Sequence, residues 1–317
     1  METAERGMSF LIWIGALTVL AVAAAPFFPE PRRITDTLSH FALQGAVAAI
    51  ALLIIAVFSR AGGQALYLCL LLSYGLGLFH IWPYFKTRRP KKDPNAQTLK
   101  ILQANVLVRN TNAFALETLI RTEKPDIVLL MEVNDAFAQL CNDLSADYPH
   151  HHVIANDTTS FGIAVLSVLP LHDLETKHLA EAHIPSLFFK IQKNEKTFHV
   201  VALHAENPLR RIDWRDREFK ELATWHEKEM PQHLIVGGDF NATPWCPALK
   251  KLARSTGLKN ARKGFGLHGT FPAHMPLNLL RLPIDHVLTS PETDVLEFRA
   301  VKLRGSDHRS TITIIKL

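Results

Sequence analysis

Eight polar side chains lie at or near the ends of apolar, strand-like runs beyond residue 98 of this 317-residue chain. They are Asn105, Glu132, His204, Asp239, Asn241, Asp285, Asp307 and His308. Carboxylate and amide oxygens are hard ligands that suit Mg²⁺ or Mn²⁺, and a carboxylate can activate a water molecule. An imidazole held by a second carboxylate can bind or protonate a phosphoryl oxygen. The set therefore predicts metal-assisted hydrolysis of a phosphate compound.

Some of these residues also have simpler explanations when taken singly. Asn105 is compatible with a turn, and Glu132 with an exposed surface position. Asp239 and Asn241 are harder to explain in that way, because they follow the apolar run HLIV and two glycines, and alternation along an extended chain turns both to one face. Asp285 interrupts the apolar run PIDHVL, where an unpaired carboxylate would be costly. A histidine is the expected partner.

Short apolar runs with β-branched residues are predicted to be the strands that position these side chains. In chain order they are LKILQANVLV, DIVLLMEV, GIAVLSVLP, FHVVALH, HLIVGGDF, PIDHVLTS and STITIIKL. Helices are predicted at AFALETLIRT and WRDREFKELATWHEKEM, where apolar residues recur at helical spacing. The histidine run at 150–152 is expected in a solvated loop. Strands interleaved with helices predict an α/β or α+β sandwich of layers.

The first 92 residues have a different composition, which predicts a membrane anchor with three transmembrane helices. Three stretches contain no charged side chain: 8–28, 37–59 and 61–85. Each is long enough, at about 1.5 Å per helical residue, to cross a hydrocarbon core of roughly 30 Å. A cleaved signal peptide is the alternative for the first stretch, but two further stretches follow it directly. Polar and aromatic side chains near the stretch ends are expected at the membrane interface: His40, His80, Trp82 and Tyr84.

Charge is divided unevenly along the chain. Residues 1–92 contain nine Lys or Arg and four Asp or Glu, whereas residues 93–317 contain 26 of each. A general nucleic-acid binder places its basic excess on the binding domain, so nucleic acid is possible but disfavoured as a partner. The three cysteines are too few for a disulfide framework or a four-cysteine zinc site.

The distribution of basic residues also predicts an orientation in the membrane. With three spans, the loop after the first span lies on the same side as the domain, and this side carries seven basic residues against two on the other. The positive-inside rule therefore favours a cytoplasmic domain in a multi-pass protein of the bacterial inner membrane. The cluster KTRRPKK at 86–92 would lie near anionic headgroups, although it is equally compatible with a stop-transfer flank.

Seven motifs occur in a characteristic order: QANV, LLMEV, GIAVLS, VALH, GGDFN, PIDHV and GSDHR. In this order they resemble the endonuclease/exonuclease/phosphatase superfamily, the deoxyribonuclease I-like fold, over about residues 98–317. The resemblance implies an α+β domain built as a four-layer α/β/β/α sandwich, with two mixed sheets packed together and flanked by helices. Three transmembrane helices are expected to precede it.

The resemblance also implies a metal site. Glu132 would be the principal ligand, with Asn105 beside it and Asp307 as a further ligand or a neighbour of the metal. The cofactor expected is Mg²⁺ or Mn²⁺.

Catalytic roles follow from the same resemblance. Asp239 would orient or deprotonate the attacking water, and Asn241 would position the phosphate. His308 would stabilise the developing negative charge or assist the leaving group, with Asp285 holding it in the right tautomer. His204 matches the family's other phosphate-facing histidine. The tyrosine that apurinic-site endonucleases place between the Glu and His motifs has no convincing counterpart, which argues against DNA repair.

A narrower similarity concerns GDFNATPWCPALKKLARSTGL, followed by GTFP and RLPIDHVL. These segments are similar to a membrane-anchored bacterial branch that includes the teicoplanin-resistance membrane proteins. That branch implies a domain outside the cytoplasm, in opposition to the charge count. Trp245 and Phe271 are candidates for the substrate entrance, with core packing at the sandwich rim as the alternative. Four arginines form either a basic ridge or a solvated helix start: Arg210, Arg211, Arg215 and Arg217.

These observations predict an anchor over 1–92, a linker over 93–98 and a hydrolase domain over 99–317. The expected function is metal-dependent hydrolysis of phosphate esters or pyrophosphates. The expected substrates are small molecules or membrane-associated ones, including lipid-linked phosphates. A membrane-tethered nuclease is the enzymatic alternative. A membrane scaffold with a silent phosphate-binding domain is the non-enzymatic one.

Overall fold

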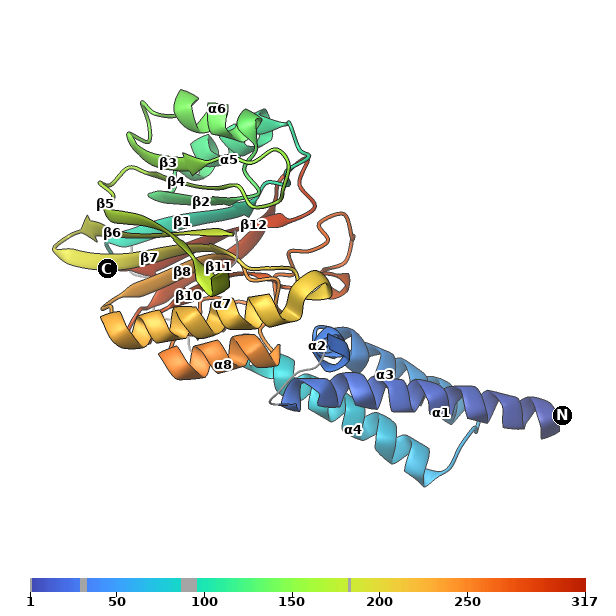
Figure 1. Cartoon of the computed structure of the whole chain (residues 1–317). Coiled ribbons are helices and arrows are strands. Elements are labelled where there is room, and N and C mark those ends of the chain that lie inside the picture. The colour runs from blue at the N-terminus through green and yellow to red at the C-terminus, as the bar shows by residue number, and fades with distance from the viewer. Residues whose placement is uncertain (1, 29–32, 87–95, 182–183) are drawn as a thin grey trace.

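The computed structural model describes residues 2–28, 33–86, 96–181 and 184–317, with side chains from residue 7 onward. Two six-stranded sheets pack face to face, and helices cover their outer surfaces (Figure 1). This arrangement is the expected α+β four-layer sandwich, so the predicted fold class is confirmed.

The first sheet has the strand order β11-β12-β1-β2-β4-β3. Its strands are β1 Thr98–Asn105, β2 Ile127–Met131, β3 His150–Ile154, β4 Ile163–Ser167, β11 Val295–Lys302 and β12 Arg309–Lys316. The central strands β1 and β2 run parallel, with Asn105 opposite Met131. Helices α5 Ala113–Glu123 and α6 Asp135–Asp143 lie over the outer face.

The second sheet has the strand order β5-β6-β7-β8-β10-β9 and, like the first, a parallel pair at its centre. Its strands are β5 His172–His178, β6 Pro185–Lys193, β7 Lys196–His204, β8 Leu234–Asp239, β9 Lys259–Asn260 and β10 Asp285–Thr289. Strands β7 and β8 are parallel, with His204 opposite Asp239. Its outer face is covered by α7 Pro208–Glu229 and α8 Pro247–Thr256, and short 3-10 turns η3 Leu179–Glu181 and η4 Asn278–Leu280 lie in the loops.

Both faces of the central strands of each sheet are buried, which explains why the predicted strands are almost continuously apolar. In β1, Leu99 and Ile101 belong to the core between the sheets, whereas Leu102 and Ala104 belong to the core under the helices. All seven predicted strands are present. The expectation of a loop at 150–152 is wrong, because these histidines form the half-buried edge strand β3 and pair with β4.

The segment before the sandwich forms a separate helical bundle that extends away from it (Figure 1). Its helices are α1 Glu2–Ala24, α2 Arg33–Ser39, α3 Ala42–Phe58 and α4 Gln64–Ile81, with 3-10 turns η1 Ala25–Phe27 and η2 Trp82–Tyr84. The apolar segments Gly7–Phe27 and Gln64–Tyr84 are long enough to cross a membrane. A third crossing exists only if α2 and α3, which are bent by 70°, count as one span. The predicted continuous helix over 37–59 is therefore wrong at its beginning.

The bend has a physical cause in the contacts of α2 with the sandwich. Asp36 and Arg215 form a bidentate ion pair at 2.8 and 3.0 Å, and both side chains are almost fully buried. His40 lies at the break, with Nε2 3.3 Å from Asp36 and Nδ1 3.2 Å from the Thr243 hydroxyl. A buried carboxylate or imidazole needs polar partners. The sandwich supplies them to Asp36 and His40, so α2 turns toward it.

The junction of the bundle and the sandwich corrects the expectations for four residues. His40, His80 and Tyr84 are buried, whereas Trp82 is exposed as expected for an interfacial residue. Arg215 is buried in the ion pair with Asp36, so the four arginines do not form one basic ridge. Residues 93–95 of the predicted linker at 93–98 lie outside the described residues, and β1 begins at Thr98.

Candidate active site

The sandwich brings the eight predicted residues together at one edge of the two sheets. Asn105, His204 and Asp239 are the last residues of β1, β7 and β8, and Glu132 directly follows β2. Asp285 begins β10, and Asp307 and His308 directly precede β12. The carboxyl ends of parallel strands meet the amino ends of their antiparallel neighbours at the same edge of a sheet, so these residues gather at one place.

Six of the eight line a cleft of about 190 Å³: Glu132, His204, Asp239, Asn241, Asp307 and His308. Asn105 and Asp285 lie behind this surface and bond to residues that form it. The cleft is also lined by residues that the sequence analysis did not assign to the site: Ser160, Phe161, Glu206, Asn207, Arg210 and Ile284. Apart from Arg210, which lies in the first turn of α7, they are outside the helices and strands of the structure.

Glu132 is held in an unusual backbone conformation. Its φ is 61°, in the left-handed region that side chains other than glycine rarely adopt. Its Oε1 accepts a hydrogen bond from Asn105 Nδ2 at 2.9 Å, and its Oε2 accepts one from the Val108 amide at 3.0 Å. Asn105 Nδ2 also donates to Asp239 Oδ2 at 3.1 Å. Asn105 thus connects the two carboxylates across the two sheets.

Asp239 lies at the centre of the cluster and is buried. Its Oδ2 is 3.8 Å from His204 Nε2 and 3.7 Å from His308 Nε2. Burial and the nearby Asp285 carboxylate raise the pKa of Asp239 to about 6, although the two imidazoles act in the opposite direction. Both separations exceed the length of a hydrogen bond, so neither imidazole Nε2 is hydrogen-bonded to Asp239. Each Nε2 can therefore bond to an oxygen of a ligand in the cleft.

His308 and Asp285 form a buried pair. His308 Nδ1 lies 2.9 Å from Asp285 Oδ2. Burial disfavours the charged imidazole, but the Asp285 and Asp239 carboxylates outweigh it and raise the pKa of His308 to about 10. Burial alone would raise the pKa of Asp285. The charge of His308 and the hydrogen bonds that the Asp285 carboxylate accepts outweigh burial and hold this pKa below its usual range. The predicted carboxylate–histidine partnership is therefore present in the geometry.

The pair rests on a residue that the sequence analysis did not single out. Gln103 is fully buried, and its Nε2 donates to Asp285 Oδ1 at 2.9 Å. Its Oε1 accepts a hydrogen bond from Thr311 at 3.0 Å. The available signal was a polar residue inside the apolar run LKILQAN, two positions before Asn105 and therefore on the same face of the strand.

Asn241 is placed by the glycines that precede Asp239. A Cβ atom on Gly238, whose φ is 157°, would lie 1.7 Å from the Leu203 carbonyl oxygen, so β7 and β8 approach closely only with glycine here. The Asn241 amide N–H donates to Asp239 Oδ1 at 2.9 Å, and its Nδ2 donates to the Ala205 carbonyl at 2.8 Å. One Nδ2 hydrogen remains for another acceptor.

The residues at the cleft fit a divalent cation. Asp307 lies in the lining, and its Oδ1 is buried without a hydrogen-bond partner among the described residues. Glu132 supplies a second carboxylate to the same lining. Asp239, Asp285 and His308 also lie close enough together to hold a metal ion. Asp285 already pairs with His308 Nδ1, whereas Asp307 Oδ1 has no partner among the described residues.

The two aromatic candidates for the substrate entrance have different positions. Phe271 lines the cleft, and its ring centroid is 4.9 Å from that of His308. Trp245 is buried outside the cleft, where it packs with Tyr84 and Leu267. It is therefore a core residue between the bundle and the sandwich, and only Phe271 lies where the entrance hypothesis expected it.

Comparison with family models gives a match to the endonuclease/exonuclease/phosphatase family over residues 102–308. The chain belongs to this family. The match contains all eight candidate residues, and membership supports a hydrolase of phosphoester bonds. No curated protein matches the chain.

Solved structures of the endonuclease/exonuclease/phosphatase fold resemble the sandwich. TDP2 from D. rerio, complexed with a single-strand DNA product, has a TM-score of 0.60 at 16% identity and covers 70% of this chain and 100% of its own. A family protein from Leptotrichia buccalis has a TM-score of 0.57 at 16% identity, with coverage of 69% and 100%. The beta toxin of Staphylococcus aureus has a TM-score of 0.52 at 17% identity, with coverage of 68% and 99%. At these identities the likeness establishes the fold alone.

Proposed function

We propose that this protein is a membrane-anchored, divalent-metal-dependent hydrolase that cleaves a phosphate ester or pyrophosphate presented at a membrane surface. The observation that carries the proposal is that the helical bundle contacts two segments that flank the catalytic cleft. Arg33 on α2 donates to the Leu209 carbonyl beside Arg210, which lines the cleft. Gln44 on α3 donates to the Leu279 carbonyl in η4 at 2.8 Å, on the loop that carries Phe271.

Apolar side chains on these elements are exposed around the contacts. They are Ile34, Phe41, Leu209, Leu277 and Leu280. A bilayer that surrounds the bundle would bring its surface close to the cleft, and the exposed side chains would then meet acyl chains or the apolar part of a substrate. Tethering of this kind raises the effective concentration of the site toward a membrane-bound phosphate.

In this proposal Glu132 and Asp307 hold Mg²⁺ or Mn²⁺. Asn105 contributes through Oδ1, which also accepts the Leu107 amide hydrogen. When bound, the cation supplies positive charge next to the phosphate and offsets the charge that develops on its oxygens.

The remaining residues act on water and on the phosphoryl group. Asp239 orients the attacking water and accepts its proton, and Asn241 uses its free Nδ2 hydrogen to hold a phosphate oxygen. His308 presents Nε2 to the cleft because Asp285 occupies Nδ1, so it stabilises negative charge or protonates the leaving group. His204 faces the same space from the other side of Asp239.

A substrate comparison tests the proposal. The purified full chain is assayed in mixed micelles for hydrolysis of a lipid pyrophosphate and a phospholipid, and in solution for a chromogenic phosphodiester and duplex DNA. All assays use matched physiological salt with Mg²⁺, Mn²⁺ or a chelator. We expect a higher kcat/KM for a micellar substrate than for DNA, and complete loss with the chelator.

Each alternative has its own outcome. If duplex DNA is the better substrate and its cleavage falls steeply with added salt, the protein is a membrane-tethered nuclease. If no phosphoester is cleaved with either metal although phosphate binds, the protein is a scaffold with a silent binding domain. Turnover that survives the chelator would contradict the metal requirement.

A further inference from the structure

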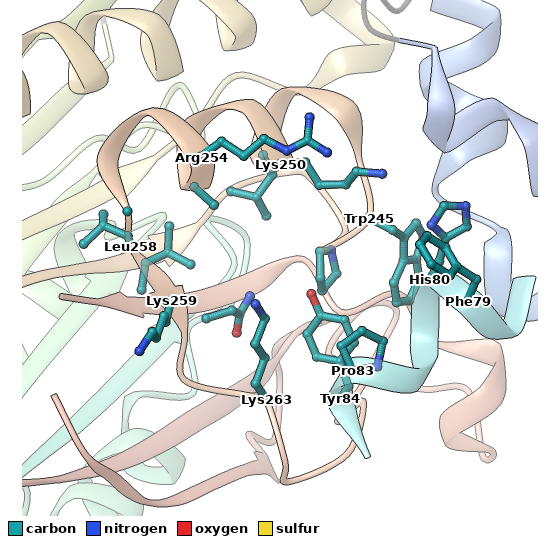
Figure 2. A pocket seen from close by; sticks show the side chains of 16 residues that line it. Phe79, His80, Pro83, Tyr84, Trp245, Lys250, Arg254, Leu258, Lys259 and Lys263 are labelled. Atoms are coloured by element: carbon teal, nitrogen blue, oxygen red, sulfur yellow. The ribbon is translucent and has the colours of Figure 1, made fainter. Parts of the chain in front are cut away.

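A second cavity lies at the junction of the bundle and the sandwich. It has a volume of about 470 Å³, within the range of roughly 300–1,000 Å³ that is common for ligand pockets. The end of α4 with η2 forms one side, and α8 with the segment after β9 forms the other (Figure 2). We call it the junction cavity. It shares no lining residue with the catalytic cleft.

The junction cavity is strongly basic. Its lining includes Lys250, Arg254, Lys259 and Lys263, and none of its 16 described lining residues is an aspartate or glutamate. Lys250 Nζ donates to the Pro26 carbonyl and Lys259 Nζ to the Pro291 carbonyl, which are neutral acceptors. Within the described part of the chain, no carboxylate forms an ion pair with any of these cations. Their charges are therefore available to an anion.

The cations also repel one another. Burial, followed by the neighbouring Arg254, lowers the pKa of Lys250. Burial, followed by Lys259, lowers the pKa of Lys263. An anion bound between these side chains would relieve both effects, because it favours the charged form of each amine.

The rest of the lining is mostly aromatic and apolar, apart from His80 and Asn260, and it is continuous with a helix that is able to span a membrane. Phe79 and His80 come from the last turn of α4, and Trp245 packs beside them (Figure 2). His80 Nε2 is buried with no hydrogen-bond partner among the described residues. Phe79 and the neighbouring Trp82 are largely exposed, as expected of aromatic side chains at the level of lipid headgroups.

We propose that the junction cavity binds the phosphate headgroup of an anionic phospholipid from the surrounding bilayer. Basic residues of the lining hold the phosphate, and the exposed aromatic surface of α4 and η2 meets the start of the acyl chains. A soluble phosphate would use the same cations but not this surface. The bound lipid would fix the sandwich against the bundle, whatever substrate the catalytic cleft takes.

A binding experiment separates these possibilities. The full chain in a neutral detergent is titrated with short-chain phosphatidylglycerol, and the apparent Kd is obtained from the rise in Tm that a ligand of the folded state produces. Short-chain phosphatidylcholine, glycerol phosphate and inorganic phosphate are titrated in parallel. The test variant is Arg254→Gln with Lys263→Gln. The matched control is Lys251→Gln with Lys220→Gln, which removes the same charge from exposed positions outside the cavity.

We expect phosphatidylglycerol to stabilise the wild type more than the other three ligands do. The test variant should weaken this binding by about tenfold or more, the loss typical of a removed charge-assisted contact, and the control by less than about twofold. The single variant Arg254→Gln, at an exposed position, should show the same direction if the double variant is unstable. Equal stabilisation by phosphatidylcholine, equal binding of inorganic phosphate, or equal weakening in the control would each overturn the proposal.

Discussion

Glu132 combines a left-handed backbone with a carboxylate whose two oxygens both accept hydrogen bonds. Such a conformation costs about 1–3 kcal/mol and persists only where surrounding contacts hold it. Glu132→Gln keeps the shape of the side chain and one acceptor oxygen, so it retains one of these two hydrogen bonds. We therefore expect this variant to fold and to lose at least about 100-fold in Mg²⁺-dependent kcat, because a neutral amide is a poor ligand for a hard cation.

The measurement is hydrolysis of a soluble phosphodiester together with circular dichroism of the same sample. Glu227→Gln, at an exposed position on α7, is the matched control. Normal activity in a folded Glu132→Gln protein would show that the metal role belongs to another residue.

The pair of His308 and Asp285 makes a prediction about coupling. The 2.9 Å contact between Nδ1 and the carboxylate implies that each residue is effective only with the other. Asp285→Asn should therefore lower kcat about as much as His308→Ala, and the double variant should lose little more than either single variant. Steady-state kinetics of the three variants tests this, and losses that simply multiply would mean that the residues act separately.

At the scale of elements, the contact between α2 and α7 links the bundle to the active site. Arg215 pairs with Asp36, and its Nη1 also lies 3.5 Å from the Asn241 carbonyl. Asp36→Asn leaves a buried guanidinium with Asp216 as its remaining carboxylate. We expect a loss of about 1–4 kcal/mol in stability and a several-fold fall in kcat, because the segment that carries Asn241 loses support.

Thermal unfolding of the full chain in detergent measures the stability change. Arg217→Gln on the same helix is the control, since its pair with Asp213 at 3.8 Å is exposed and such pairs contribute at most about 1 kcal/mol. An Asp36→Asn protein with the Tm and kcat of the wild type would show that this ion pair supports neither the stability of the fold nor the active site.

A second prediction at this scale concerns Glu218 on α7. Burial, assisted by the nearby Glu206, raises the pKa of Glu218 to about 8. The folded state then binds a proton that the unfolded state releases above its ordinary pKa of about 4.5. Stability should fall as pH rises from about 4.5 to about 8, by up to a few kcal/mol. Glu218→Gln should flatten this part of the curve of Tm against pH, and an unchanged slope would contradict the assignment.

At the scale of the whole molecule, the charge count raises the question of which side of the membrane the sandwich domain faces. In Figure 1, the N-terminus and the turn between α3 and α4 lie at the end of the bundle remote from the sandwich, while α2 lies beside it. If α2 and α3 together make one crossing, the seven-to-two count of basic residues in the sequence applies to this arrangement. We expect a cytoplasmic domain.

Cysteine labelling in intact cells tests the orientation. Thr122→Cys is exposed on α5, and Gly63→Cys is exposed in the turn between α3 and α4. An impermeant thiol reagent should label Gly63→Cys and not Thr122→Cys, against the background of the native cysteines. Labelling of Thr122→Cys would instead support the extracytoplasmic side that the narrower resemblance implies.

The strands and the candidate residues were predictable because each depends on local pattern. Seven apolar runs became strands, since a strand buried on both faces needs an unbroken apolar sequence. The ordered motifs at their ends indicated the family, and the expected pairing of Asp285 with a histidine is found at His308. The local sequence also contains Gly238 directly before Asp239. The close approach of β7 and β8 at this position leaves no room for a side chain.

The partners of the buried polar residues and the break in the predicted helix depended on contacts between distant segments. Gln103 supports Asp285 across 182 positions, and Asp36 meets Arg215 across 179. No periodicity in either segment encodes such a pair, because each side chain is satisfied only once the sheets and the bundle have packed. For the same reason the predicted helix over 37–59 breaks at His40, and Trp245 is buried away from the cleft. The sequence by itself determined which residues can do the chemistry, whereas the tertiary structure decided what surrounds them, because burial and partnership arise only when separate segments exclude water together.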